Sequence, residues 1–247
     1  MKHDTSHPTV ILSGKENAVQ NLSKLITLAE YRFVKARRVV IKSNVCGMFP
    51  PDIRLLERTV ELFQPFAESI VFGETDSAMH SPEERLRQLG ITDLASRHNV
   101  ELKNLLKDQI VRKKVPHPHA MIEIPLPSSL FEDVVLVNVA GLGTHRTTGL
   151  TCALKNLFGL VAVRSKYSVL HPLGVDLVIA DVYQVVKPDL NIVDAGSRVI
   201  VGTSALAVDV VAAEVKGINS LDVEHLVLAG KNLGISLEEL EIEKITL

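Results

Sequence analysis

The stretch Val134-Val135-Leu136-Val137-Asn138-Val139 decides the fold, because it is the strongest candidate for a buried strand in the chain. Its apolar residues follow one another without polar alternation, which is typical of a parallel strand covered on both faces. A glycine-rich loop from Gly141 to Gly149 comes next, and a helix is predicted through Lys155 to Phe158. Strand, loop and helix in this order form the repeating unit of α/β proteins.

The same alternation extends in both directions from this stretch. Two helix starts carry capping boxes, Ser13–Glu16 and Ser81–Glu84, and Pro51 suits a first helical position. Strands are predicted at residues 9–13, 39–41, 70–72, 191–195 and 198–203, and further helices over 173–186, 205–215 and 223–233.

Prolines between residues 100 and 130 predict a hairpin-like β insertion, with extended pieces at 111–115 and 121–125. We therefore predict an α/β fold with a mostly parallel, Rossmann-like sheet, covered by helices on both faces and carrying that irregular insertion. A single domain over residues 1–247 is expected, and two packed lobes, 1–133 and 134–247, are the alternative.

Composition excludes several classes of protein. Of the 247 residues 46% are hydrophobic, which excludes a disordered chain. The 27 basic and 29 acidic residues nearly cancel, so no global positive field for nucleic acid or a membrane surface is expected. Aromatic residues make up 4% and Trp is absent, which argues against a base-stacking platform.

The cysteine content and the pattern of apolar residues indicate in which cellular compartment the protein is expected. Cys46 and Cys152 cannot form a disulfide framework, and they cannot hold a four-cysteine cluster, so no iron–sulfur cluster is expected within the chain. Residues 1–8 lack the apolar core of a signal peptide, and no apolar run is long enough for a membrane span. We expect a soluble, cytoplasmic protein, with its oligomeric state left open.

One segment of this neutral chain is locally cationic. Residues 134–175 contain no Asp or Glu, although about five would be expected from the chain average. The segment carries the basic residues His145, Arg146, Lys155, Arg164, Lys166 and His171. We expect this surface to bind a small anion.

Polar residues at the predicted strand ends suggest where the anion binds. In an open parallel sheet, ligands bind at the carboxyl ends of the strands, and glycine lets backbone N–H groups approach an anion closely. The glycine spacing fits neither a dinucleotide fingerprint nor a P-loop. The expected substrate-binding residues are Lys42, Asn44, Gly143, Thr144, Thr148, Gly149, Lys155, Asn156 and Arg164. The alternative is that polar residues only mark where strands stop.

His145 is the candidate for proton transfer, together with Glu74 or Asp76. The alternatives are a hydrogen bond within the loop for His145 and capping of the following turn for the two carboxylates. His117 and His119 would share one face of an extended segment, but no third metal ligand is suggested nearby, so exposed loop histidines are preferred to a metal site.

At many of the candidate site residues the sequence resembles the domain of unknown function 362 family, an uncharacterised α/β group often fused to ferredoxin-like iron–sulfur modules. The resemblance covers residues 39 to 234 and is most specific at the central motifs. The matching motifs are Lys42-Ser43-Asn44, Gly73-Glu74 with Asp76-Ser77, Thr144-His145, Thr148-Gly149-Leu150-Thr151, Lys155-Asn156-Leu157-Phe158-Gly159, Pro188, Ile192-Val193-Asp194 and Ala207-Val208-Asp209.

The sequence departs from that family at several positions. Gly141 and Gly143 stand where lysines are usual, and Ser204 replaces a common acidic residue. The cysteine-rich module is not found in this sequence. The chain is therefore expected to be an enzyme or a ligand-binding protein whose strand-end cleft takes a small phosphorylated or carboxylated metabolite. The alternative is a non-catalytic accessory or redox-partner protein that contacts an iron–sulfur protein.

Overall fold

The computed structural model describes residues 7–76, 81–131 and 133–247 of the chain. Ser77 of the acidic motif and residues 1–6 lie outside the described residues. The strands are β1 (Thr9–Gly14), β2 (Ala36–Ser43), β3 (Ala67–Glu74), β4 (Glu101–Asn104), β5 (Ile110–Lys114), β6 (Glu123–Pro127), β7 (Val134–Gly141), β8 (Gly143–His145), β9 (Gly149–Thr151), β10 (Leu190–Asp194), β11 (Arg198–Gly202) and β12 (Glu243–Thr246).

Helices alternate with these strands over most of the chain. They are α1 (Lys15–Leu28), α2 (Ile53–Phe63), α3 (Pro82–Gln88), α4 (Ile91–His98), α5 (Ala153–Phe158), α6 (Lys166–Leu170), α7 (Val175–Val185), α8 (Ala205–Lys216) and α9 (Glu224–Asn232). None of the helices within the described residues has the length and apolar character needed to cross a membrane.

The predicted α/β architecture is confirmed. The main sheet of the described residues has eight strands in the order β12-β1-β11-β10-β7-β2-β3-β4. Neighbouring strands run parallel, except that β11 is antiparallel to both β1 and β10. β7, from the second half of the chain, pairs directly with β2 from the first half.

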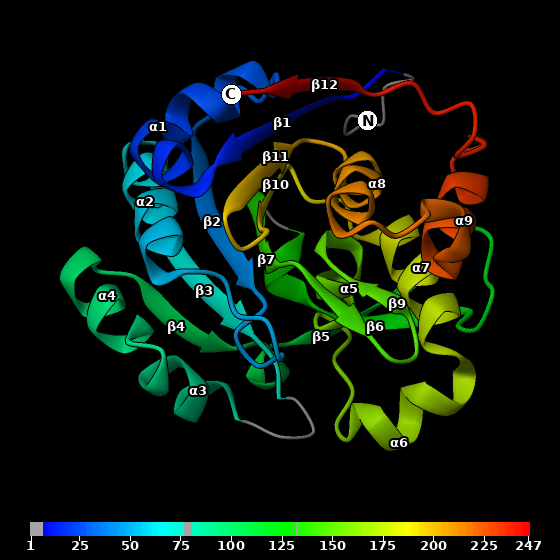
Figure 1. Ribbon diagram of the computed structural model, residues 1–247. Coiled ribbons are helices and arrows are strands. Elements are labelled where there is room, and N and C mark those ends of the chain that lie inside the picture. The colour runs from blue at the N-terminus through cyan, green and yellow to red at the C-terminus, as the bar shows by residue number, and fades with distance from the viewer. Residues whose placement is uncertain (1–6, 77–80, 132) are drawn as a thin grey trace.

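Helices cover both faces of the sheet, as Figure 1 shows: α1, α2 and α4 lie on one side, and α5, α7, α8 and α9 on the other. Side chains alternate between these faces along each strand. Val39 and Ile41 of β2 belong to the apolar core under α1 and α2, whereas Val40 belongs to the core under α5, α7 and α8. Both faces are therefore buried, which explains the unbroken apolar strands of the sequence.

Two smaller sheets lie outside the main one. The predicted insertion is confirmed as the antiparallel pair β5–β6. Asp181 of α7 holds the connection between these strands, because its carboxylate accepts hydrogen bonds from the backbone N–H groups of His119, Ala120 and Met121, each at 2.8 Å. The second pair, β8–β9, is part of the glycine-rich segment.

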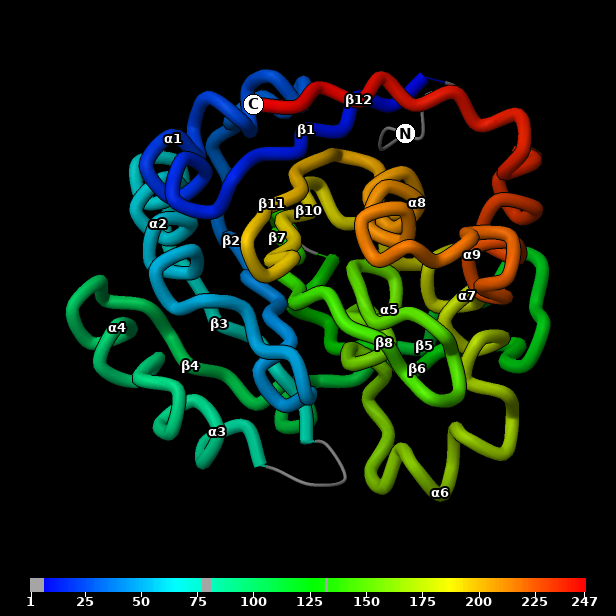
Figure 2. The backbone as a smooth tube through the Cα atoms, viewed as in Figure 1, coloured from blue at the N-terminus to red at the C-terminus, as the bar shows by residue number. Residues whose placement is uncertain are grey.

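The two ends of the described chain meet in the sheet. β12 pairs in parallel with β1, and Figure 2 shows the red C-terminal segment running beside the blue N-terminal strand. This edge lies away from the strand ends that carry the predicted site, because β1 and β12 are separated from β2 by β11, β10 and β7.

Several local predictions need correction. Ser13 does not cap α1: it lies in β1, Gly14 is the N-cap, and no side chain caps this helix. α2 begins at Ile53 and is capped by the Asp52 carboxylate rather than starting at Pro51. The segment after β7 is a short hairpin rather than an irregular loop. Ser81 does cap α3, by accepting a hydrogen bond from Glu84 N.

Candidate functional site

A buried lysine lies at the carboxyl end of β2. Lys42 is 1% exposed, and its Nζ donates to Glu74 Oε2 at 2.9 Å, to Asn156 Oδ1 at 2.7 Å and to Ser43 O at 3.2 Å. An ammonium group has three N–H donors, so the protein itself uses all of them. Glu74 Oε1 also accepts a hydrogen bond from Thr75 N at 2.9 Å.

Asparagine side chains continue this polar contact across the sheet. Asn156 Nδ2 donates to Asn138 Oδ1 at 2.7 Å, and Asn138 Nδ2 donates to Asn191 Oδ1 at 2.9 Å. Lys42, Asn138 and Asn191 are partners in adjacent register on β2, β7 and β10. The strands therefore place one row of polar side chains on the otherwise apolar face that α5 covers, and Asn156 of α5 bridges two of them.

A pocket of about 190 Å³ opens beside this row, at the carboxyl ends of β2 and β3. Six of the predicted site residues line it: Lys42, Asn44, Glu74, Asp76, Lys155 and Asn156. The other lining residues are Cys46, Gly47, Thr75, Phe158, Gly159, Lys166, Tyr167 and His171. The strand-end position and half of the predicted residues thus meet in one hollow.

Lys155 presents a cation to this pocket without a hydrogen-bond or ion-pair partner among the residues that the structure describes. Burial lowers the pKa of its ammonium group; Asp176 opposes that effect and nearby Lys42 adds to it. Lys155 thus differs from Lys42, whose charge is compensated by Glu74.

Lys166, at the start of α6, also lines the pocket. Its Nζ donates to Thr75 Oγ1 and, at 2.6 Å, to Gly159 O. Burial lowers the pKa of Lys166 to about 7. The cationic segment of the sequence included Lys166, but no spacing or motif distinguished it from exposed lysines.

Other groups at the pocket have shifted pKa values. Burial lowers the pKa of His171, and Lys155 adds to the lowering. The ring of Tyr167 packs on that of His171, with centroids 4.3 Å apart. Burial raises the pKa of the Cys46 thiol to about 12, with Glu74 adding to the rise, so this thiol stays protonated at neutral pH.

The remaining predicted residues do not line the pocket. Gly143, Thr144, His145, Thr148 and Gly149 form the β8–β9 hairpin with its turn, and Arg164 is exposed before α6. His145 Nδ1 lies 3.3 Å from Thr148 N and 3.2 Å from Thr148 Oγ1. These contacts correspond to the hydrogen-bonded loop role considered for His145, and its part in proton transfer stays a prediction.

Glycines of this segment leave room for the protein's own side chains. A Cβ atom at Gly143 would lie 2.2 Å from the Phe49 ring, and one at Gly141 would lie 2.0 Å from Phe49 O. Gly149 has a φ of 67°, in the left-handed region that favours glycine. Two of the three glycines thus accommodate the loop that follows β2.

The backbone N–H groups at the N-terminus of α5 are likewise bound by a side chain of the protein itself. Asp209 of α8 accepts hydrogen bonds from Ala153 N at 2.8 Å and from Leu154 N at 2.9 Å. Burial raises the pKa of this carboxyl group. An internal carboxylate therefore accepts from the amide groups that the N-terminus of α5 would otherwise offer to a bound anion.

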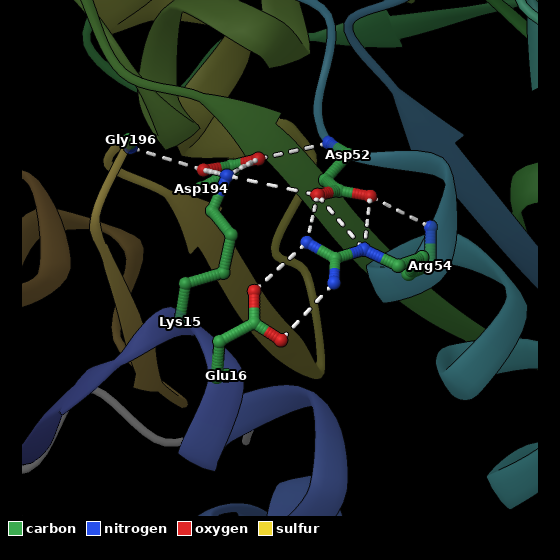
Figure 3. Close-up of polar contacts among 6 residues, drawn as sticks. All are labelled: Lys15, Glu16, Asp52, Arg54, Asp194 and Gly196. Atoms are coloured by element: carbon green, nitrogen blue, oxygen red, sulfur yellow. Dashed lines mark hydrogen bonds and ion pairs between the residues drawn. The ribbon is translucent and has the colours of Figure 1, made fainter.

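A second polar cluster fixes the loop after β2 (Figure 3). Asp194, the last residue of β10, accepts from Lys15 Nζ at 2.9 Å, from Asp52 N at 2.8 Å and from Gly196 N at 3.0 Å. Arg54 joins Asp52 to Glu16 of α1. The loop that carries Asn44, Cys46 and Phe49 is therefore anchored at its far end, next to α2.

The two histidines considered as a metal pair lie on the β5–β6 connection. His119 Nε2 is 2.9 Å from Asn232 Oδ1, and His117 N donates to Gln184 Oε1 at 2.9 Å. Within residues 7–76, 81–131 and 133–247, there is no group of three or more His, Cys, Asp or Glu side chains that could hold a metal ion.

Comparison with known proteins adds one result. No curated protein matches the chain. A family model described as Domain of unknown function (DUF362) matches residues 39–197, a range that contains β2 from Val39 onward, all of β3 and α5, and every residue lining the pocket. The chain therefore belongs to the domain of unknown function 362 family, as its strand-end motifs had predicted.

Proposed function

We propose that the pocket at the carboxyl ends of β2 and β3 binds a small anionic metabolite, phosphorylated or carboxylated. The observation that supports this most directly is the Lys155 ammonium group, which has no polar partner in the described part of the chain. A partly desolvated cation attracts an anion far more strongly than one in bulk water, so a bound anion would stabilise Lys155 in its charged form.

The size and lining of the pocket support a compact ligand. Pockets for drug-sized molecules span roughly 300–1,000 Å³, and this one has about 190 Å³. Asn44 and His171 supply polar groups at its wall, and Phe158 and Tyr167 supply apolar surface. These features favour a small acid or phosphate ester over a nucleotide.

The proposal has two forms: the protein is either an enzyme that converts the bound metabolite or a non-catalytic accessory protein that only binds it. In an enzyme, His145→Ala abolishes turnover and leaves ligand affinity nearly unchanged. In a non-catalytic accessory protein the same change alters affinity alone, and affinity capture recovers an iron–sulfur protein as partner. Because Cys46 and Cys152 are both free and buried, we place either form in a reducing compartment, the cytoplasm.

Calorimetric titration with inorganic phosphate and with citrate tests anion binding. We expect Lys155→Met to weaken binding about 10- to 100-fold, which corresponds to about 1.4–2.8 kcal/mol. The matched control is Lys24→Met, which removes an exposed lysine of α1 and should leave affinity unchanged. Equal affinities for wild type and Lys155→Met would contradict the proposal.

Proton uptake provides a second readout. Because the pKa of Lys155 is lowered in the empty pocket, a bound anion raises it, and the complex takes up protons in alkaline solution. Titrations in two buffers of different ionisation enthalpy measure this uptake. It should be lost in Lys155→Met.

A further inference from the structure

Lys166 is the third of the lysines that line the pocket, after Lys42 and Lys155, and its hydrogen-bond partners are neutral. Its Nζ donates to the Thr75 hydroxyl oxygen and to Gly159 O, and Thr75 Oγ1 in turn donates to Gly159 O. No carboxylate lies within ion-pair distance of Lys166 among the described residues. A hydroxyl and a peptide carbonyl can accept from an ammonium group or from a neutral amine; the bond from the ammonium is the stronger one, but neither acceptor carries a charge that would hold the proton on the lysine.

This arrangement suits an amine in its neutral form. An uncharged amine has two N–H bonds and one lone pair. When Thr75 and Gly159 accept the two N–H bonds, the lone pair remains for another atom. Burial lowers the pKa of Lys166 to about 7, with Lys42 adding to the lowering and Glu74 and Asp76 opposing it, so a large share of the amine is uncharged at neutral pH.

The other pocket groups are less suited to attack an electrophile. Lys42 is paired with Glu74 and has used its three donors. The Cys46 thiol stays protonated, because burial raises its pKa to about 12. Lys155 carries the charge that the proposed anion needs. Lys166 is thus the nucleophile that the pocket leaves available.

We propose that Lys166 forms an imine with the carbonyl carbon of a small aldehyde or ketone whose phosphate or carboxylate is bound by Lys155. This inference rests on the anion binding proposed above and adds the class of substrate. The two lysines come from different elements, α6 and α5, and line the same pocket. One therefore binds the anionic end of the molecule while the other reaches its carbonyl group.

The step balances without an oxidant or a reductant. The lone pair of Nζ forms a C–N bond to the carbonyl carbon, and the carbonyl oxygen takes one amine proton to give a carbinolamine. The C–O bond then breaks, and the oxygen leaves as water with the second amine proton. The product is the imine plus one water. Protonation of the imine from solvent makes the adjacent carbon easier to deprotonate or cleave.

Pyridoxal 5′-phosphate is a suitable probe, because it carries both an aldehyde and a phosphate. The protein is incubated with a small excess of the probe and reduced with borohydride, and the modified lysine is located by peptide mass spectrometry. We expect Lys166 to be the main site, with labelling at least about 10-fold faster than that of exposed lysines. Pyruvate under the same conditions tests the carboxylate form of the substrate.

Variants separate this proposal from simple surface modification. Lys166→Met and Lys166→Arg should lose the adduct and still bind inorganic phosphate, whereas Lys24→Met should label like wild type. Lys155→Met should slow labelling by the probe about 10-fold, but should not slow labelling by pyridoxal, which lacks the phosphate. Circular dichroism and thermal unfolding check that each variant folds.

Each outcome has a defined meaning. An adduct at Lys166 that depends on Lys155 supports the proposal. If the protein binds phosphate but neither pyridoxal 5′-phosphate nor pyruvate forms an adduct at Lys166, the proposed imine is overturned and the proposed anion binding remains. Absence of phosphate and citrate binding in the calorimeter overturns anion binding itself. Labelling spread evenly over exposed lysines also overturns the assignment of Lys166.

Discussion

The Lys42 ammonium makes all of its hydrogen bonds to the protein itself. Its charge lies between Glu74 Oε2 and Asn156 Oδ1, deep in the face that α5 covers. A buried ion pair of this kind is costly to form and still more costly to break, because removal of one partner leaves the other charged and unpaired. We therefore assign Lys42 to holding β2, β3 and α5 together rather than to direct contact with an anion.

Lys42→Met should destabilise the protein by about 3–5 kcal/mol, because the Glu74 carboxylate loses its counter-charge. Urea unfolding followed by circular dichroism measures the loss. The double variant Lys42→Met/Glu74→Gln should recover part of it, since no isolated charge remains. A double variant whose loss equals the sum of the two single losses would show that the pair is not coupled.

The sequence predicted single residues of the site where they follow a strand, but it did not predict which residues they would hydrogen-bond. Lys42, Glu74 and Asp76 lie at or just after the carboxyl end of a strand that is evident from its apolar run. Asn156, however, is 114 residues from Lys42 in sequence, and no local pattern reports such a contact. Lys166 was indistinguishable from other cations, because its burial depends on how α6 folds back to the pocket.

The β8–β9 hairpin shows how one element depends on another. Phe49, in the loop after β2, packs where Gly143 has no side chain. That loop is fixed further along by Asp194, which binds Asp52 N. The glycines of the hairpin therefore determine the course of a loop that forms one wall of the pocket.

Gly143→Ala should destabilise the protein by about 1–3 kcal/mol, because the new methyl group would overlap the Phe49 ring. Adding Phe49→Ala should relieve this overlap, so the double variant loses less than the two single variants combined. The matched control is Gly14→Ala, whose Cβ would meet nothing within 4 Å, with a loss below about 1 kcal/mol. Thermal unfolding compares these four variants with wild type. A loss in Gly143→Ala no greater than in the control would contradict this explanation.

Elements with a long apolar pattern were predicted correctly, whereas several of the short ones were not predicted. The helix over 173–186 and the strand over 134–139 appear as α7 and β7. α4, α6, β4 and β12 had no strong pattern, because each is eight residues or shorter and is stabilised by tertiary contacts. The hairpin β8–β9 was missed for the same reason.

At the scale of the whole molecule, stability should depend on pH through Lys166. Its pKa is about 7 in the folded protein and ordinarily 10.5, so between these values the unfolded chain binds more protons than the folded one. Stability gained from this group therefore rises with pH across that window. The charged or titratable groups that act on it are Glu74, Lys42, Asp76 and Cys46.

Urea unfolding at pH 7, 8 and 9 tests this expectation. The free energy of unfolding of wild type should rise relative to that of Lys166→Met, by about 1.4 kcal/mol per pH unit at most. Groups that titrate alike in both proteins cancel in the difference. A difference that stays constant over this range, or falls, would show that Lys166 keeps its proton in the folded state.

The position of strand β11 next to β10 determines where a chain of this family can be shortened. The matched residues, 39–197, end before β11 and begin after β1. A polypeptide limited to them would expose the backbone N–H and C=O groups along one side of β10, which is a template for aggregation, and would separate Asp194 from Lys15. A shortened chain meant to fold should therefore keep β11 together with β10, and a hybrid with another chain of this family should exchange the two strands as one segment.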